Sequence, residues 1–176
     1  MTTTTRVLFW EDVEPGMEVP TLRKGPMDQE AVIRFGAAFD DFFHIHWDVE
    51  HCKKASLPGP ILHGPFKSAC LAEMLVRWAG DHAALKQLSP TYRRWNLVGD
   101  PLVCKGKVTS RYEKDGKFLV ECDVVTESAQ GEMTTTGNAL LQLPSKANPE
   151  ETDPFYNPVR LALPTFQEPN PMTENI

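Results

Sequence analysis

The sequence predicts an α+β domain in which one long apolar helix precedes an antiparallel sheet. Three observations support this: residues 65–79 are mostly apolar, residues 89–144 have an extended pattern, and Asp115-Gly116 is a strong signal for a tight hairpin. Consecutive hairpins imply a meander of neighbouring strands. One buried helix followed by a curved antiparallel sheet is the layout of a hot dog fold, with a generic α+β sandwich as the alternative.

The N-terminal quarter contains a short strand signal, an extended segment and one helix. Residues 6–13 have short-strand character, and residues 17–23 are extended after a Glu-Pro-Gly turn. Asp28 suits the N-cap of a helix, because apolar residues follow it at helical spacing. Gly36 weakens this helix, and residues 40–41 end it.

The central helix at residues 65–79 has clear start and stop signals. Residues 48–55 form one short helical turn and residues 56–60 a Pro/Gly turn before it. Pro65 suits the first turn of a helix, and Gly80 suits the position just after its end. Because apolar side chains lie nearly all round this helix, we expect other elements to wrap around it.

The second half of the chain predicts four strands and a proline-rich extension. The strands are expected at residues 91–98, 102–112, 118–127 and 132–143. Seven of the fifteen prolines fall after residue 143, where no periodic pattern is visible. We therefore divide the chain into a hot dog domain at residues 1–144 and an extension at residues 145–176 that is packed on a surface or partly disordered.

Composition narrows the possible partners and compartments. The chain has 176 residues, 41% of them hydrophobic, which suits one domain with a sizeable core. Its net charge of −6 argues against nucleic acid and against an anionic membrane surface. No apolar run approaches the roughly 18 residues of a membrane span. The four cysteines are widely spaced without CxxC pairs, so we expect no zinc site. The lack of a membrane span and this cysteine usage together predict a soluble cytoplasmic protein.

The residues that suggest chemistry are concentrated between residues 39 and 69, which contain four of the five histidines. Asp41 and His46 are five residues apart, a spacing that a bent loop can bring together. A carboxylate beside an imidazole can hold one water and exchange protons with it, as reversible addition of water to a double bond requires. The alternative is that both side chains are solvated loop residues.

Gly64 lies where this loop region meets the central helix. Amides at a helix N-terminus are unsatisfied donors, and a residue without a side chain allows a carbonyl oxygen to approach closely. Such an amide can stabilise a thioester enolate, although Gly64 could also simply permit a tight turn. A metal alternative comes from His44, His46 and Glu50, whose HxHxxxE spacing resembles the first half of a cupin motif.

The ordered motifs resemble those of the MaoC-like, or hydratase 2, family of hot dog proteins. The family pattern is roughly GDxNPxH, then PIxHG before a long helix, then a GDxL turn and a GxV strand. Asp41 and His46 match the first motif, residues 60–64 the second, and residues 99–108 the third. The sequence departs from the pattern at Asp40 for glycine, Phe43 for asparagine, His44 for proline, and Ala72 where serine is often found.

The resemblance implies a lyase that hydrates a trans-2-enoyl-CoA with (R) stereochemistry, or a 3-hydroxyacyl dehydratase running in reverse. It assigns the water to Asp41 and His46 and the thioester oxygen to the Gly64 N–H. No metal or redox cofactor is needed. We expect at least a homodimer, or a hetero-oligomer with a sister hot dog subunit.

The resemblance also suggests substrate-binding residues. Phe42, Phe43 and Trp47 would suit a bulky apolar acyl group, His63 supports the same site, and Arg93 and Arg94 are candidates for the CoA phosphates. A loop that keeps only the aspartate and histidine looks similar to actinobacterial hydratases acting on steroid side-chain thioesters. The alternatives are a non-catalytic subunit that binds acyl thioesters and a cupin-like metalloenzyme.

Overall fold

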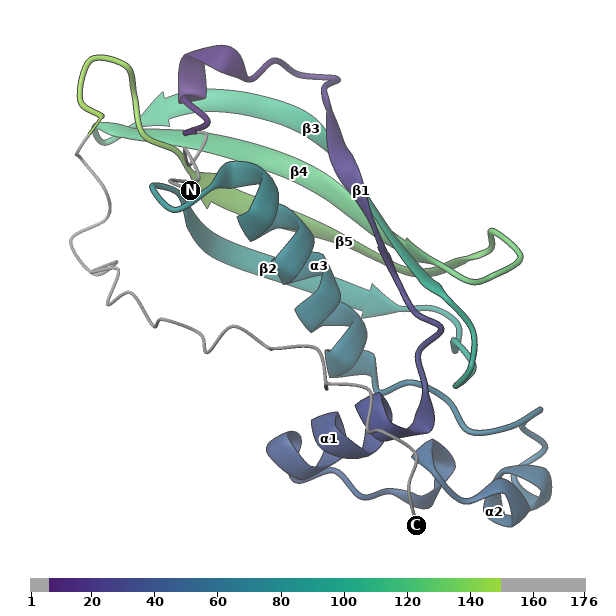
Figure 1. Ribbon diagram of the computed structural model, residues 1–176. Helices are drawn as coiled ribbons and strands as arrows, with labels where there is room; N and C mark the ends of the chain where they lie inside the picture. The colour runs from purple at the N-terminus through teal and green to yellow at the C-terminus, as the bar shows by residue number, and fades with distance from the viewer. Residues whose placement is uncertain (1–6, 150–176) are drawn as a thin grey trace, which may run out of the picture.

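A five-stranded antiparallel sheet curves around the long helix α3 (Gly64–Ala79) in this computed structural model, which describes residues 7–149 (Figure 1). The sheet order is β1-β3-β4-β5-β2. This is the α+β layout of a hot dog fold, as the sequence predicted. The strands are β1 (Glu18–Lys24), β2 (Ala84–Tyr92), β3 (Leu102–Lys114), β4 (Lys117–Glu127) and β5 (Met133–Gln142).

Two short helices lie at the N-terminal end of α3 (Figure 1). Helix α1 (Gln29–Phe39) begins at Asp28, whose side chain accepts a hydrogen bond from Ala31 N, and ends at Asp40 in the left-handed region. Helix α2 (Val49–Lys54) follows a 3-10 turn at His44–His46. The predicted caps at Asp28 and Gly80 and the predicted helix end at Asp40 are confirmed.

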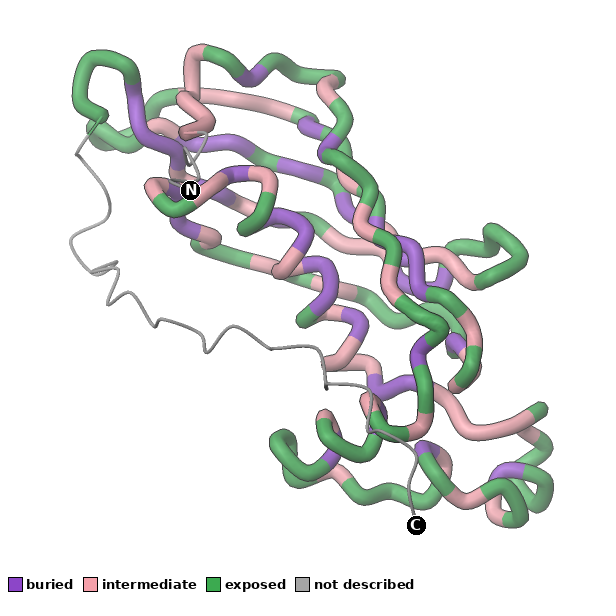
Figure 2. Tube along the Cα trace, in the orientation of Figure 1, coloured by how far each residue is buried: buried purple, intermediate pink, exposed green. Residues whose placement is uncertain are grey.

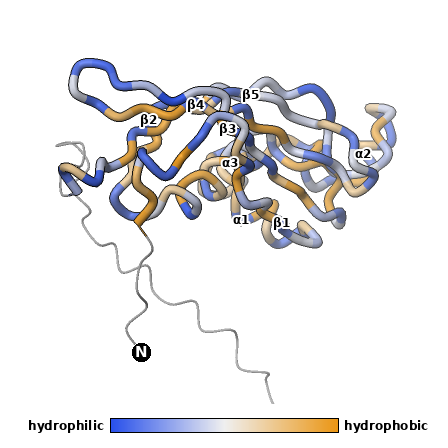
Figure 3. The backbone as a smooth tube through the Cα atoms, turned by 90° about the horizontal axis from the view of Figure 1, so that it is seen from above, coloured by the Kyte–Doolittle hydropathy of each residue, from blue (hydrophilic) through white to orange (hydrophobic). Residues whose placement is uncertain are grey.

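The core lies between one face of α3 and the concave face of the sheet. Figure 2 shows the buried positions of α3 along the side that meets the sheet, and Figure 3 shows hydrophobic stretches gathered there. The sheet wraps around this side of α3, as expected, whereas Val76 and Arg77 on the opposite side are exposed. The buried contacts join Cys70, Leu71, Met74, Leu75 and Ala79 to Cys104, Val108, Val120, Cys122 and Leu141.

The tight hairpin between β3 and β4 agrees with the prediction, whereas the first predicted strand of the sheet does not. Asp115 and Gly116 both have positive φ, of 51° and 72°, as a two-residue type I′ turn requires. Residues 91–98 were expected to be extended, but β2 ends at Tyr92. The next residues instead pair with the segment before α3: Leu62 N donates to Asn96 O at 2.9 Å.

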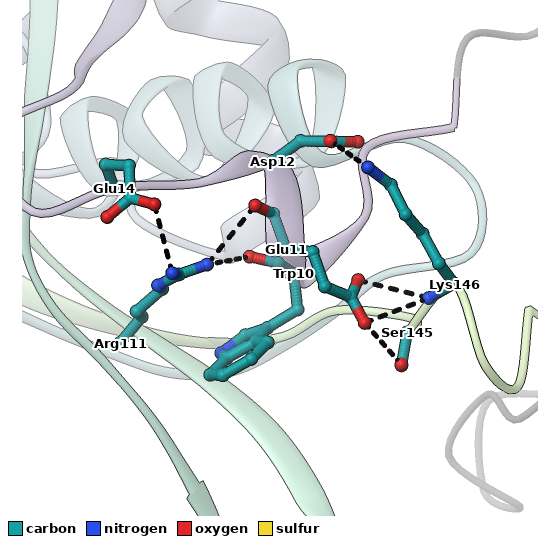
Figure 4. Close-up of polar contacts among 7 residues, drawn as sticks. All are labelled: Trp10, Glu11, Asp12, Glu14, Arg111, Ser145 and Lys146. Carbon is teal, nitrogen blue, oxygen red and sulfur yellow. Dashed lines mark hydrogen bonds and ion pairs between the residues drawn. The ribbon is translucent and has the colours of Figure 1, made fainter.

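The start of the described chain is also not a strand. Residues 10–12 form a 3-10 turn that is joined to the end of the sheet by polar contacts (Figure 4). The Glu11 carboxylate accepts hydrogen bonds from Ser145 Oγ at 2.6 Å and from Lys146 N at 3.1 Å. Arg111 donates to Trp10 O at 3.1 Å, and its guanidinium lies over the Trp10 ring. We call this set of contacts the terminal clamp.

The proline-rich extension expected at residues 145–176 falls largely outside the described residues, which stop at residue 149. All four cysteines are free and buried. Within the described range, no helix has the length and apolar character that crossing a membrane would require.

Candidate active site

The two segments that carry the predicted site residues meet at the N-terminal end of α3. Residues 40–48 connect α1 to α2, and residues 60–63 lead into α3. Ile61 N donates to Ile45 O at 3.0 Å, which joins the two segments directly. Gln29 Nε2, in the first turn of α1, donates to His46 O at 3.0 Å. The loop that carries His46 is therefore fixed by bonds to its main chain from two directions.

The structure brings Asp41 and His46 together. Asp41 Oδ2 lies 3.8 Å from His46 Nε2, and His46 Nδ1 lies 2.7 Å from the Ile61 carbonyl oxygen. A carbonyl can only accept, so Nδ1 carries a proton, and in the neutral ring Nε2 is an acceptor. Two acceptors 3.8 Å apart do not bond to each other. One water placed between them can donate one hydrogen bond to each.

The Asp41 carboxylate is oriented by the main chain of its own loop. Phe43 N donates to Asp41 Oδ1 at 3.2 Å, which leaves Oδ2 facing His46. Asp41 N in turn donates to Gly36 O at 2.9 Å. Phe43 stands where the family pattern has asparagine, so a backbone amide fixes the carboxylate in a loop that lacks that side chain. This is an Asx-type turn, which the residue identities alone do not reveal.

His63 lies beneath the pair. Its side chain is 1% exposed, and its ring stacks on that of His46 with centroids 3.7 Å apart. His63 Nε2 donates to the Asp41 carbonyl at 3.1 Å. Burial lowers the pKa of His63; the bond to Asp41 raises it, and the nearby His46 lowers it further, so the net shift is downward. These contacts make His63 a support for Asp41 and His46, and its burial separates it from the surface that a substrate would reach.

Gly64 is the first residue of α3, and its N–H has no protein acceptor in the described part of the chain. Its Cα is covered by Tyr92, because a Cβ built on Gly64 would lie 2.8 Å from the Tyr92 ring. The Tyr92 hydroxyl is 2.7 Å from Ser68 Oγ. Sequence reasoning missed Tyr92 and Ser68, since β2 was expected to begin near the point where it ends.

The remaining predicted residues lie around this centre, where Phe43 contacts it through its main-chain N–H. Phe42, Phe43 and Trp47 are 57%, 56% and 44% exposed, so they present aromatic surface next to Asp41 and His46. Arg93 and Arg94 are exposed and directly follow Tyr92. The structure thus gathers Asp41, His46, His63 and Gly64 at one end of α3, with the aromatic residues on the same loop and the arginines at the end of β2.

The predicted cupin-like metal set is not formed among the described residues. His44 stacks on His51 at 5.2 Å between ring centroids, and Glu50 pairs with Lys53. A different group, Asp41, His46 and His63, has one potential ligand atom each within 4.8 Å. The two imidazole planes are only 24° apart in their stack. Lone pairs in nearly parallel, stacked planes do not converge on one ion, so this geometry favours a bridging water.

Comparisons with known proteins agree with this fold. The family model described as "MaoC like domain" matches residues 12–130. No curated protein sequence matches the chain. Among solved structures, the (R)-hydratase from A. caviae involved in PHA biosynthesis superposes with a TM-score of 0.69 at 22% identity, covering 76% of this chain and 99% of that one.

Two further solved structures show the same likeness. R-hydratase PhaJ1 from Pseudomonas aeruginosa gives a TM-score of 0.69 at 17% identity, with 78% of this chain and 86% of that chain covered. A chain of the ChsH1-ChsH2 complex from Mycobacterium tuberculosis gives 0.65 at 20% identity, with 74% and 98% covered. Identities this low establish a shared fold.

Proposed function

This chain belongs to the MaoC-like domain family, and on that basis we propose that it hydrates a trans-2-enoyl-CoA thioester to a 3-hydroxyacyl-CoA, or catalyses the reverse dehydration. One observation carries the proposal: the two acceptor atoms of Asp41 and His46 are 3.8 Å apart, next to the unpaired N–H at the start of α3. Water, acid/base groups and an oxyanion donor are the components that this reaction needs.

In the hydration direction, the pair binds and activates one water. The water donates one hydrogen bond to Asp41 Oδ2 and one to His46 Nε2, so its oxygen lone pair is free to attack C3 of the enoyl group. As the C3–O bond forms, His46 Nε2 takes a proton from the water and the double-bond electrons move toward the thioester oxygen. C2 then takes a proton from the pair, which restores both side chains.

The negative charge that develops on the thioester oxygen needs a donor. The Gly64 N–H is at the positive end of the α3 dipole and is proposed to donate a hydrogen bond to the thioester oxygen. The Tyr92 ring fills the place that a Gly64 side chain would take. A fixed amide of this kind stabilises an enolate more than the ground-state carbonyl, which lowers the barrier. The reaction written this way uses no metal ion and no redox cofactor.

The surface around Asp41 and His46 favours a substrate with a bulky apolar acyl group. Phe42, Phe43 and Trp47 expose about half of their area beside Asp41, and exposed aromatic surface of this extent is typical of a binding site. We extend the proposal to thioesters with large ring-containing acyl groups, such as steroid side-chain esters, with Arg93 and Arg94 contacting the CoA phosphates. We also propose self-association, or association with a second hot dog subunit, as in the two-protein complex noted above.

A spectrophotometric hydration assay with short, long and steroid-derived enoyl-CoA esters tests the proposal. Asp41→Asn and His46→Gln are expected to lower the rate by about a hundred-fold or more, since each removes an acid/base group. Asp40→Asn and His44→Gln, which change exposed neighbours in the same loop, serve as matched controls. If both site variants keep nearly full activity, the assignment is wrong. Ester binding without turnover by the wild type would favour the non-catalytic subunit.

A further inference from the structure

Lys67 is a buried cation that the proposed reaction does not use. It is the fourth residue of α3 and is 2% exposed, although lysine is almost never fully buried without a partner. Its Nζ donates to the Arg94 carbonyl at 2.8 Å and to the Thr134 carbonyl at 3.3 Å. Both partners are neutral main-chain oxygens. Lys67 therefore binds the main chain at Arg94 and Thr134 and forms no ion pair among the described residues.

This position is electrostatically unfavourable. A positive charge in the first turn of a helix opposes the helix dipole. Burial lowers the pKa of Lys67 to about 8, because water no longer solvates the ammonium group. A neutral side chain of similar length would avoid both costs. The contacts made by Nζ are therefore the feature that requires an explanation.

These contacts fix the segment that carries the two arginines. The Thr134 carbonyl accepts from Arg93 N at 2.9 Å and from Arg94 N at 3.1 Å as well as from Lys67. Lys67 Nζ also donates a hydrogen bond to Arg94 O. It lies 5.5 Å from the centre of the Tyr92 ring that covers Gly64. The end of β2 is thus held to the first turn of α3 through one ammonium group.

We propose that Lys67 is a positioning residue that holds Arg93 and Arg94 where they bind the phosphates of the CoA portion of the substrate. The inference rests on the proposed function for the identity of the ligand. Its physical basis is preorganisation, because a backbone already fixed by hydrogen bonds loses less conformational freedom when its side chains bind an anion. Lys67 acts through Arg93 and Arg94 and does not touch the reacting atoms.

The proposal predicts a dependence on pH. Above about pH 8 Lys67 loses its proton, and hydrogen bonds from a neutral amine are weaker than those from an ammonium group. The groups that face Nζ are the Tyr92 ring and the Arg94 main chain at the end of β2, and the Thr134 carbonyl from β5. We expect KM for an enoyl-CoA to rise above pH 8 in the wild type, and this rise to be absent in Lys67→Met.

Two thioesters of the same acyl group separate positioning from general structural support. With enoyl-CoA, Lys67→Met should raise KM about tenfold, the effect expected for losing one charge-assisted hydrogen bond, while kcat changes little. With the N-acetylcysteamine thioester, which lacks phosphates, both constants should stay near the wild-type values. Lys24→Met is the matched control, because Lys24 contacts α3 through Glu73 at 2.7 Å. An equal rise in KM, or an equal fall in kcat, with both thioesters would overturn the proposal.

A second pair of measurements does not depend on turnover. Hydrogen exchange of residues 93–98 should be faster in Lys67→Met than in the wild type, and calorimetric titration with adenosine 3′,5′-bisphosphate should show weaker binding. If the wild type hydrates no ester, the proposed reaction fails while these measurements still decide the role of Lys67. Unchanged exchange and unchanged nucleotide binding in Lys67→Met would show that Lys67 does not position the arginines.

Discussion

The imidazole rings of His63 and His46 are stacked, with centroids 3.7 Å apart and planes 24° apart. Two protonated rings at this distance would repel each other strongly. Burial, together with the neighbouring His46, lowers the pKa of His63 although the bond to the Asp41 carbonyl opposes this. His63 is therefore the ring that stays neutral, which leaves the proposed role of proton acceptor to the other ring of the stack.

The first prediction concerns the bond from His63 to the Asp41 main chain. His63→Phe keeps an aromatic ring against His46 but removes the donor to Asp41 O. We expect kcat for enoyl-CoA hydration to fall about fivefold, because losing a buried hydrogen bond of about 1 kcal/mol lets the Asp41 loop shift, while KM changes little. Steady-state kinetics check this. A variant with unchanged kcat would show that His63 does not position Asp41.

The second prediction is a pH dependence of stability that comes from the same ring. Because the pKa of His63 is lowered in the folded state, the unfolded chain binds more protons as pH falls below about 6.5, the ordinary histidine value. Stability should therefore fall as pH decreases through this range. In His63→Phe this contribution is absent, so the Tm difference between the two proteins should change between pH 8 and pH 5. A constant difference would contradict the assignment of a neutral His63.

The third prediction concerns Gly36, which the sequence suggested only as a weak point in α1. Replacing a helical glycine by alanine normally stabilises a helix by about 1 kcal/mol. Here the new Cβ would lie 2.8 Å from the Asp41 carbonyl oxygen and 3.4 Å from His63 Nε2. The main chain at Asp41 would have to move. We expect Gly36→Ala to lower both Tm and the hydration rate.

The control for this prediction lies in the same helix. Ala38 is exposed, so Ala38→Gly should lower stability by about 1 kcal/mol through helix propensity alone and leave the rate unchanged. Thermal unfolding and kinetics of both variants separate the two effects. A Gly36→Ala protein that is more stable than the wild type and fully active would show that the close packing of Gly36 on Asp41 is not required.

Local signals in the sequence were sufficient for most of the fold. The cap at Asp28, the stop at Gly80 and the turn at Asp115-Gly116 depend on neighbouring residues only, and all three are present. The edge strand β2 was misplaced because it contains Pro90 and few apolar residues, and an edge strand pairs on one side only. Its true position depends on pairing with β5, which local patterns do not encode.

In the candidate site, too, local sequence identified some residues, and only the folded structure revealed the others. Asp41 and His46 were identified because they are close in the chain and match a known pattern. The roles of Lys67 and Tyr92 arise only where the end of β2 folds against α3, so no spacing in the sequence indicates them. The hydrogen bond from the Phe43 amide to the Asp41 carboxylate depends on backbone conformation and could not be predicted from residue types.

The fourth prediction concerns the N-terminal residue of α3. A Cβ on Gly64 would lie 2.8 Å from the Tyr92 ring, and Tyr92 can swing outward because it is half exposed. Gly64→Ala should therefore cost little stability but obstruct the approach to the Gly64 N–H, and kcat should fall by about a hundred-fold, as for loss of an oxyanion donor. Tyr92→Phe, which removes only the contact with Ser68, is the control. Full activity in Gly64→Ala would exclude this amide as the donor.

The fifth prediction concerns the terminal clamp (Figure 4), which lies at the opposite end of α3 from the site (Figure 1). Burial tends to raise the pKa of Glu11, but the hydrogen bonds from Ser145 and Lys146 N outweigh it and lower the pKa. A lowered carboxylate pKa contributes stability at neutral pH that is lost as pH falls through the folded-state value. Glu11→Gln should therefore lower stability by about 1 kcal/mol at pH 7 and reduce the loss of Tm in acid.

Glu14 provides the comparison for Glu11, because it lies in the same segment but is more exposed. Its carboxylate pairs with Arg111 at 3.0 Å, and its side chain is 65% exposed, so Glu14→Gln should change stability by less than about 0.5 kcal/mol. Both variants should hydrate enoyl-CoA at the wild-type rate, since neither side chain contacts the loop of Asp41 and His46. Equal stabilities for Glu11→Gln and Glu14→Gln from pH 3 to pH 7 would mean that the Ser145 and Lys146 contacts do not stabilise the fold.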